Sequence, residues 1–236
     1  MVNFSAVPGA EPRARLDPMG PDTVLLDVDG TLVDSNYHHV VAWRHAFALH
    51  GVDVPAARIH RAVGMGGDRL VAAVAGEDVE REAGDAVREA WEAGYDALVH
   101  QVRPLPGAAD LVQACAQAGA AVVLASSGKA KHLDAARALL DVDEHLAGVT
   151  TGDDVDASKP AGDIFAVALR SAGGRGGVVV GDTPWDARAA DAVAMPCVLL
   201  RTGGFCDEDL RREHPVVALL DTPAALAGRV HDLLLR

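Results

Sequence analysis

Lysine and aromatic residues are scarce in this chain of 236 residues. Only three residues are lysine, aromatic residues make up 4%, and the formal net charge is −13. Nucleic-acid backbones are held mainly by clustered cations, and unstacked bases rest on aromatic rings. The composition therefore argues against a nucleic-acid partner.

Cysteine is also rare, and long hydrophobic runs are missing. The three cysteines, Cys115, Cys197 and Cys206, form no CxxC pair, which argues against a disulfide framework or a structural zinc site. No apolar run approaches the roughly 18 residues that a membrane-spanning helix needs. Residues 1–20, rich in proline, glycine and alanine, do not resemble a signal peptide. We expect a soluble, cytoplasmic protein with a loose tail at 1–20, and the sequence leaves its oligomeric state open.

Hydrophobic residues are abundant, at 50% of the chain, and they follow two patterns. Short apolar runs with β-branched residues predict buried parallel strands, and the stretches after them show helical periodicity. The expected strands are 23–27, 121–126, 147–151, 178–182 and 197–201, with 216–219 as a further edge strand. The expected helices are 108–118, 129–140, 161–172, 185–194 and 222–235. This alternating order predicts an α/β fold with a doubly wound, Rossmann-like parallel sheet.

The stretch 36–103 interrupts the alternating order because it shows no convincing strand. Apolar residues there recur at three- and four-residue spacing, first around Trp43 and again over 79–102, which is typical of amphipathic helices. We therefore expect a small helical domain at 36–103, inserted into a core made of 21–35 and 104–236.

Two carboxylates follow the first predicted strand. Asp27 and Asp29 stand in the sequence DVDGT, where the strand opens into a loop. Open α/β sheets bind their ligands at this carboxyl edge, and alternate residues of an extended strand point to the same side. Both carboxylates can therefore face one site, although aspartate and glycine are also common in plain turns.

Further polar residues stand where later strands end or helices begin. They are Ser126, Lys159 and Asp182. Asp27 and Asp182 at one edge would repel each other unless a hard, oxygen-seeking cation such as Mg²⁺ lay between them. Such a cation, with Ser126 and Lys159 as donors, makes a pocket for a phosphoryl group. Asp27 is then placed to act as a nucleophile on phosphorus.

These motifs resemble, in type and in order, the four motifs of the haloacid dehalogenase-like hydrolase superfamily. The matching segments are DVDGTLVDS at 27–35, the strand-end Ser126, SKPAGDIF at 158–165 and GDTPWD at 181–186. The resemblance covers 22–202, and it implies a Rossmann-like core whose helical insert is a cap that closes over the active site.

The resemblance also implies roles for individual residues. Asp27 would attack phosphorus to form an aspartyl-phosphate, while Asp29 would protonate the leaving oxygen and later deprotonate water. Mg²⁺ would be held by Asp27, the backbone carbonyl of Asp29 and Asp182. Asp186 would lie behind the metal and orient Lys159 or a metal-bound water. The phosphoryl-binding groups would be Ser126, Lys159 and the backbone donors of Gly30 and Ser127.

Several residues of the predicted cap are candidates for substrate contact. The loop at 64–67 holds three glycines in four residues, which suits either close approach to a ligand or a plain turn between helices. Arg69 is a candidate contact for an anionic substrate, and His39 is similar in spacing to a histidine that opens the cap in the β-phosphoglucomutase-like branch. The aromatic residues Trp43, Trp91 and Tyr95 are expected in the cap core rather than as a substrate platform. The sequence does not assign roles to Arg58, Arg61, His38 or the segment 203–215.

Three functions remain open at this point. A dehalogenase would not need Asp29, and phosphonoacetaldehyde hydrolysis requires a cap lysine, whereas 30–128 contains none. The preferred hypothesis is an Mg²⁺-dependent phosphatase of a small phosphomonoester, of the sugar phosphate or phosphoglycolate type. The alternatives are a β-phosphoglucomutase-like phosphosugar mutase and a non-catalytic, metal-binding receiver-like protein.

Overall fold

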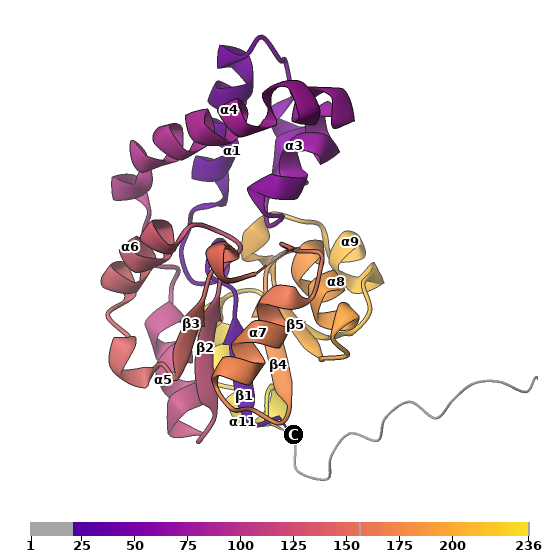
Figure 1. The fold of residues 1–236 in the computed structure, drawn as a ribbon. Helices are drawn as coiled ribbons and strands as arrows, with labels where there is room; N and C mark the ends of the chain where they lie inside the picture. Colours follow the sequence, from indigo (N-terminus) through magenta and orange to yellow (C-terminus); the bar gives the residue numbers. More distant parts are fainter. Residues whose placement is uncertain (1–20, 156, 236) are drawn as a thin grey trace, which may run out of the picture.

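A computed structural model describes residues 21–155 and 157–235, so the expected tail at 1–20 lies outside the described residues. The core is a sheet of six parallel strands in the order β3-β2-β1-β4-β5-β6 (Figure 1). The strands are β1 (Thr23–Leu26), β2 (Ala121–Ala125), β3 (Gly148–Thr150), β4 (Gly177–Gly181), β5 (Cys197–Leu200) and β6 (Val216–Leu220). The predicted doubly wound α/β fold and its strands are confirmed.

The central strands β1, β2, β4 and β5 are buried on both faces of the sheet, and nearly all of their residues are apolar or glycine. Alternate residues of a strand point to opposite sides, and accordingly Val24 and Leu26 enter one core cluster while Leu25 enters the other. Apolar residues of α5, α6, α10 and α11 complete the first cluster, and those of α7, α8 and α9 complete the second. These helices are α5 (Ala108–Gln117), α6 (Ala130–Leu140), α7 (Asp163–Ser171), α8 (Pro184–Ala192), α9 (Asp207–Arg212), α10 (Pro223–Ala227) and α11 (Val230–Leu233).

A helical insert, residues 36–101, stands above the carboxyl edge of the sheet (Figure 1). It consists of α1 (Asn36–Leu49), α2 (Ala56–His60), α3 (Gly67–Ala75), α4 (Glu77–Asp96) and the 3₁₀ turn η1 (Val99–Gln101). Trp43 and Trp91 stack with ring centroids 4.7 Å apart and join α1 to α4. The insert returns to the core where Val33 pairs with Pro104 as an isolated antiparallel bridge.

Some predicted helices differ from the structure in their extent. The helix expected at 222–235 is two short helices, separated at Gly228 and Arg229, and the one expected at 79–102 ends as an α-helix at Asp96. Helix α9, in which Leu210 is the one buried residue, was not predicted from the sequence. Short 3₁₀ turns complete the path at η2 (Asp143–His145), η3 (Gly152–Asp154) and η4 (Arg201–Gly203). Among the described residues, no helix has the length and hydropathy needed to cross a bilayer.

Candidate active site

The three central strands bring their carboxyl ends together at one point of the sheet. In β1, Leu26 is in register with Leu124 of β2 and Val180 of β4. Each strand is followed directly by a polar residue: Asp27 after β1, Ser126 after β2 and Asp182 after β4. All three are buried. The parallel register therefore produces the site that the strand-end motifs predict.

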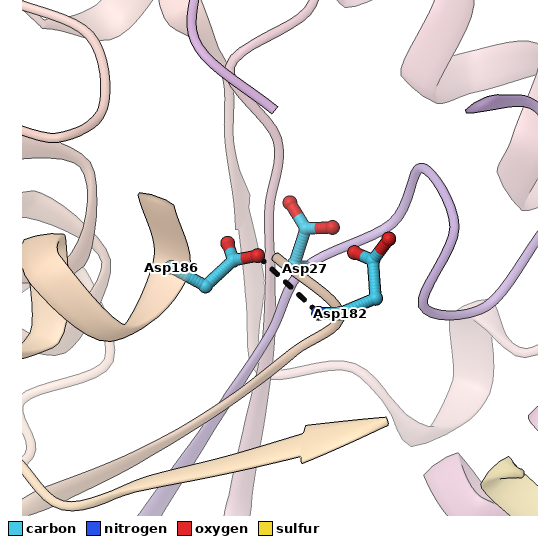
Figure 2. A group of neighbouring side chains, drawn as sticks. All are labelled: Asp27, Asp182 and Asp186. Atoms are coloured by element: carbon cyan, nitrogen blue, oxygen red, sulfur yellow. Dashed lines mark hydrogen bonds between the residues drawn. The ribbon is translucent and has the colours of Figure 1, made fainter. Parts of the chain in front are cut away.

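A cluster of carboxylates occupies this edge. Asp27, Asp182 and Asp186 each place one oxygen within 4.8 Å of the others, and all three side chains are buried (Figure 2). The two oxygens of Asp182 accept hydrogen bonds from the Thr31 hydroxyl at 3.0 Å and from the Asn36 amide at 2.8 Å. Asp182 is thus fixed by one residue of the core loop and by the first residue of the insert.

Asp186 is held by the start of α8. Thr183 and Asp186 form a capping box, in which Asp186 Oδ2 accepts from the Thr183 backbone amide at 3.0 Å and from its hydroxyl at 2.7 Å. Such a box satisfies amides that lack partners at a helix N-terminus. The other carboxylate oxygen of Asp186 accepts from the Lys159 ammonium at 2.6 Å. The capping motif therefore aims Asp186 at Lys159.

Lys159 is a fully buried cation between two acids. Its side chain is 1% exposed, and its ammonium group donates to Asp27 as well as to Asp186. Burial lowers the pKa of Lys159, but the charges of Asp186 and Asp27 outweigh it and hold that pKa above the ordinary value. Burial raises the pKa of Asp27 to about 7, against the opposing charge of Lys159 and with the added repulsion of Asp186.

The cluster has the composition of a site for a hard divalent cation. Burial, and then repulsion by Asp186 and Asp27, raise the pKa of Asp182 well above its ordinary value. The amide oxygen of Asn36 is buried and, among the described residues, without a hydrogen-bond partner. Excess buried negative charge and an oxygen acceptor without a donor both fit a hydrated Mg²⁺, which prefers oxygen ligands and keeps several waters.

Asp29 is held by hydroxyl and imidazole groups rather than by the acid cluster. Its Oδ1 accepts from the Ser35 hydroxyl at 2.6 Å and lies 3.1 Å from His39 Nε2, and its Oδ2 accepts from the Ser126 hydroxyl at 3.3 Å. The His39 ring stacks on Tyr95 with centroids 3.9 Å apart. Although burial raises the pKa of Asp29, the charge and hydrogen bond of His39 and the hydrogen bond of Ser35 bring it below the ordinary value.

A pocket lies between the insert and the core. Its core side is formed by Asp27, Asp29, Ser127 and Gly128. Its insert side is formed by His39, Trp43, Val63, Gly64, Met65, Gly66, Gly67, Leu70 and Trp91. The loop at 64–67 therefore approaches the site, and Trp43 and Trp91, which are core residues of the insert as expected, also line the pocket. The buried Ser127 hydroxyl has no hydrogen-bond partner among the described residues, so it is available to a ligand.

Other candidate residues lie away from this pocket or are already engaged. Arg69 is not among the pocket-lining residues, and its guanidinium lies 3.8 Å from Asp68. Arg58 and Arg61 are exposed. The Gly30 amide donates to the Val33 carbonyl at 2.8 Å, so that donor is occupied within the loop.

Contacts across the seam between the insert and the core join the two parts, and no sequence pattern predicts them. His60 Nε2 lies 2.8 Å from the Gly203 carbonyl, and the Trp185 indole donates to the Arg61 carbonyl at 3.0 Å. The Ser158 hydroxyl accepts from the Gly66 amide at 3.2 Å. Gly203 packs against Asp182, since a Cβ there would lie 2.4 Å from the Asp182 carbonyl oxygen. Part of the segment 203–215 thus supports the acid cluster and receives the insert.

Comparisons with known proteins agree with this architecture. The model of the haloacid dehalogenase-like hydrolase family matches residues 21–193. A CbbY protein of Cupriavidus necator is 29% identical over 224 residues, which cover 85% of this chain and 86% of that protein. A phosphoglycolate phosphatase of Rhodobacter capsulatus is 27% identical over 188 residues, covering 76% and 84%.

A solved structure shows the same fold. The crystal structure of a hydrolase from Pseudomonas syringae superposes with a TM-score of 0.84 at 29% identity, and the match covers 89% of this chain and 98% of that one. The family match spans most of the chain and includes the carboxylate cluster, Lys159 and the helical insert. The chain belongs to the haloacid dehalogenase-like hydrolase family.

Proposed function

We propose that the protein is an Mg²⁺-dependent phosphatase that hydrolyses a small phosphomonoester through an aspartyl-phosphate on Asp27. The observation that carries the proposal is the position of Asp27. Its carboxylate lines the pocket, contacts the buried Lys159 and lies beside Asp182, while Asp29 lines the same pocket. A nucleophile and an acid/base thus face one small space, and a buried cation contacts the nucleophile from within the core.

The first step forms a bond between an Asp27 carboxylate oxygen and phosphorus as the bond from phosphorus to the leaving oxygen breaks. The proton that the leaving oxygen takes up passes from His39, whose Nε2 lies 3.1 Å from Asp29, through the Asp29 carboxylate, which is left ionised for the second step. Lys159 has three N–H donors, of which Asp27 and Asp186 take two. The third donor and the Ser127 hydroxyl hold phosphoryl oxygens, and the Ser126 hydroxyl joins them when it turns away from Asp29 Oδ2, to which it donates at 3.3 Å in the free site.

The second step returns Asp27 to its free form. Water attacks phosphorus, Asp29 accepts a proton from that water, and the bond between Asp27 and phosphorus breaks to release inorganic phosphate. The pKa of Asp29 lies below its ordinary value, so the resting carboxylate is ionised and can act as the base. The hydrogen bonds from Ser35 and His39 fix its orientation for both transfers.

Mg²⁺ would be held by carboxylate oxygens of Asp27 and Asp182 and by the backbone carbonyl of Asp29. When bound, it neutralises charge on the transferring phosphoryl group and on the acid cluster. Asp186 serves this site by holding Lys159, as their 2.6 Å contact indicates.

The insert acts in this proposal as a cap that excludes bulk water while the ester is bound. Its contacts through His60, Arg61 and Gly66 hold it against the core. The name of the Rhodobacter capsulatus relative, a phosphoglycolate phosphatase, supports a small phosphate ester of the sugar phosphate or phosphoglycolate type as the substrate. The three free cysteines, of which Cys206 is exposed, support a reducing compartment such as the cytoplasm.

The test is release of inorganic phosphate from a panel of small esters, with and without Mg²⁺. We expect Mg²⁺-dependent release by the wild type and loss of at least about 1000-fold in kcat for Asp27→Asn, which removes the nucleophile. Asp29→Asn should also lose turnover, but it should still accumulate the aspartyl-phosphate from an activated ester such as p-nitrophenyl phosphate. Full activity of Asp27→Asn would contradict the proposal.

A phosphosugar mutase is the second candidate, and the contact between His39 and Asp29 favours it through the resemblance noted above. The insert has no lysine, whereas mutases of that branch commonly use a cap lysine. Following glucose 1-phosphate in the same assay separates the two: isomerisation to glucose 6-phosphate faster than phosphate release indicates a mutase, and the reverse indicates a phosphatase.

A further inference from the structure

The insert side of the pocket, called the wall below, is largely apolar. The carboxylates in the rest of the lining are negative. Trp43, Val63, Met65, Leu70 and Trp91 form the apolar part of the wall. The ionisable groups that complete the lining are the two core aspartates and His39. His39 Nε2 lies against the Asp29 carboxylate, so a protonated His39 is already paired with Asp29.

The arginines nearest this wall are already paired. Arg88 donates to the Gly67 carbonyl at 3.2 Å from behind the loop, and it also bonds Glu80 at 2.9 Å and Asp85 at 2.8 Å. Arg69 lies beside Asp68 with 44% of its side chain exposed. A second anionic group on a substrate would therefore meet apolar side chains, the glycine backbone of the loop at 64–67 and the Asp29 carboxylate, with no lysine or arginine among the described lining residues. Burying an unpaired charge in such surroundings is costly.

Trp91, which lines the pocket, carries a polar atom without a partner in the described part of the chain. Trp91 is 8% exposed, and its indole nitrogen is buried without a hydrogen-bond partner among the described residues. An indole N–H can only donate, and a buried donor without an acceptor costs free energy that a bound acceptor recovers. Trp43, stacked on Trp91 at 4.7 Å, offers a flat apolar face beside it.

Resting on the proposed phosphatase function, we infer that the leaving group of the substrate is uncharged and bears a hydroxyl that accepts a hydrogen bond from Trp91. The carbon skeleton of this leaving group packs on Trp43, Met65 and Leu70, and the phosphoryl group alone carries the negative charge of the substrate. Within the small phosphomonoesters, this selects polyol and sugar monophosphates over phosphocarboxylates and bisphosphates.

The first experiment compares esters that differ in one charge. Glycerol 3-phosphate and 3-phosphoglycerate have the same three-carbon skeleton, and phenyl and 4-carboxyphenyl phosphate form a second pair. We expect kcat/KM to be about 100-fold higher for the neutral member of each pair, which corresponds to about 2.7 kcal/mol. Equal or higher kcat/KM for the anionic members overturns the inference while leaving the phosphatase intact. No phosphate release from any of the four esters overturns the proposed function itself.

The second experiment changes the charge of the wall. Met65 is half-buried in the loop at 64–67, so a longer polar side chain there can reach either the pocket or solvent. Met65→Lys should raise kcat/KM for 3-phosphoglycerate relative to glycerol 3-phosphate by at least about tenfold, and Met65→Gln, of similar length but uncharged, should leave this ratio unchanged. A selective loss of 3-phosphoglycerate turnover in Arg69→Ala would show that a cation does reach the leaving group and would overturn the inference.

The third experiment tests the indole donor. Trp91→Phe keeps an aromatic ring but removes the N–H, and it should lower kcat/KM for glycerol 3-phosphate about five- to tenfold relative to phenyl phosphate. Trp185→Phe makes the same change on a tryptophan that does not line the pocket and should leave that ratio unchanged. Equal effects of the two variants on the ratio would refute the role of Trp91, and a thermal unfolding curve for each variant shows that the fold is retained.

Discussion

Removing the Lys159 ammonium should destabilise the protein far more than removing an exposed lysine. Lys159→Met keeps the length and the apolar stem but leaves Asp27 and Asp186 facing each other in a site where the three side chains are 8% exposed or less. Breaking a buried ion pair by removing one partner costs about 3–5 kcal/mol because the remaining charge stays buried. We expect a loss of that size in the free energy of unfolding.

The measurement is urea denaturation in the presence of EDTA, followed by far-ultraviolet circular dichroism. With an m-value of about 2–3 kcal/mol/M, the midpoint should fall by roughly 1–2.5 M. The matched control is Lys129→Met, since Lys129 lies 3.7 Å from Asp153 with about half of each side chain exposed, and such surface pairs contribute about 0–1 kcal/mol.

A double variant shows whether the loss comes from the unpaired charge. Asp186→Asn keeps an oxygen for the capping box at Thr183 but removes the negative charge, so Lys159→Met combined with Asp186→Asn should be more stable than Lys159→Met alone by about 1–3 kcal/mol. The reasoning is refuted if Lys159→Met costs no more than Lys129→Met, or if the second substitution adds to the loss in full.

Three further predictions concern the cluster and the seam above it. Asp182→Asn relieves repulsion in the acid cluster, so it should raise the unfolding temperature of the EDTA-treated protein by a few degrees. It should also abolish the increase in unfolding temperature that Mg²⁺ gives the wild type. A lower unfolding temperature of the variant in EDTA would contradict this prediction. His60→Phe keeps a ring between the insert and the core but loses the contact with the Gly203 carbonyl, 2.8 Å away. It should speed hydrogen exchange at 56–67 while lowering the free energy of unfolding by only about 1 kcal/mol. Unchanged exchange would show that His60 does not hold the insert against the core. Gly30→Ala should destabilise by more than about 2 kcal/mol, because the glycine has a φ of +79° and the new Cβ would lie 2.2 Å from Asn36 Nδ2; a near-neutral urea midpoint would show that the loop can shift.

The sheet and the core acids could be predicted because local sequence determines them. A parallel strand covered on both faces is nearly continuously apolar, as VLL at 24–26 is, and such runs are recognisable without knowledge of their neighbours. Since ligands bind at the carboxyl edge, the acids that follow β1 and β4 are expected at one site once the strands are placed. Because Leu26 of β1 is in register with Val180 of β4, the acids after the two strands lie close together.

Contacts between distant segments could not be predicted in this way. Asn36 and Asp182 are 146 positions apart and His60 and Gly203 are 143 apart, and neither pair has a pattern of its own. The sequence also shows that Trp91 is apolar and helical, but only the packing of α4 against α1 shows that it lines the pocket as well. Helix α9 escaped notice because its sequence DEDLRR buries a single leucine and has no periodicity.

The insert contacts two of the acids of the candidate active site, Asp182 and Asp29. Asn36, the first residue of α1, donates to Asp182, and His39, one turn later, contacts Asp29. His60 reaches the Gly203 carbonyl, and Gly203 in turn packs against the Asp182 backbone. A cation bound by the acid cluster therefore changes the charge on Asp182, which also contacts the insert through Asn36 and packs against Gly203. Because linkage between two equilibria is reciprocal, any coupling of cation binding to closure of the insert must act equally in both directions, so that the closed insert favours the cation as much as the cation favours closure.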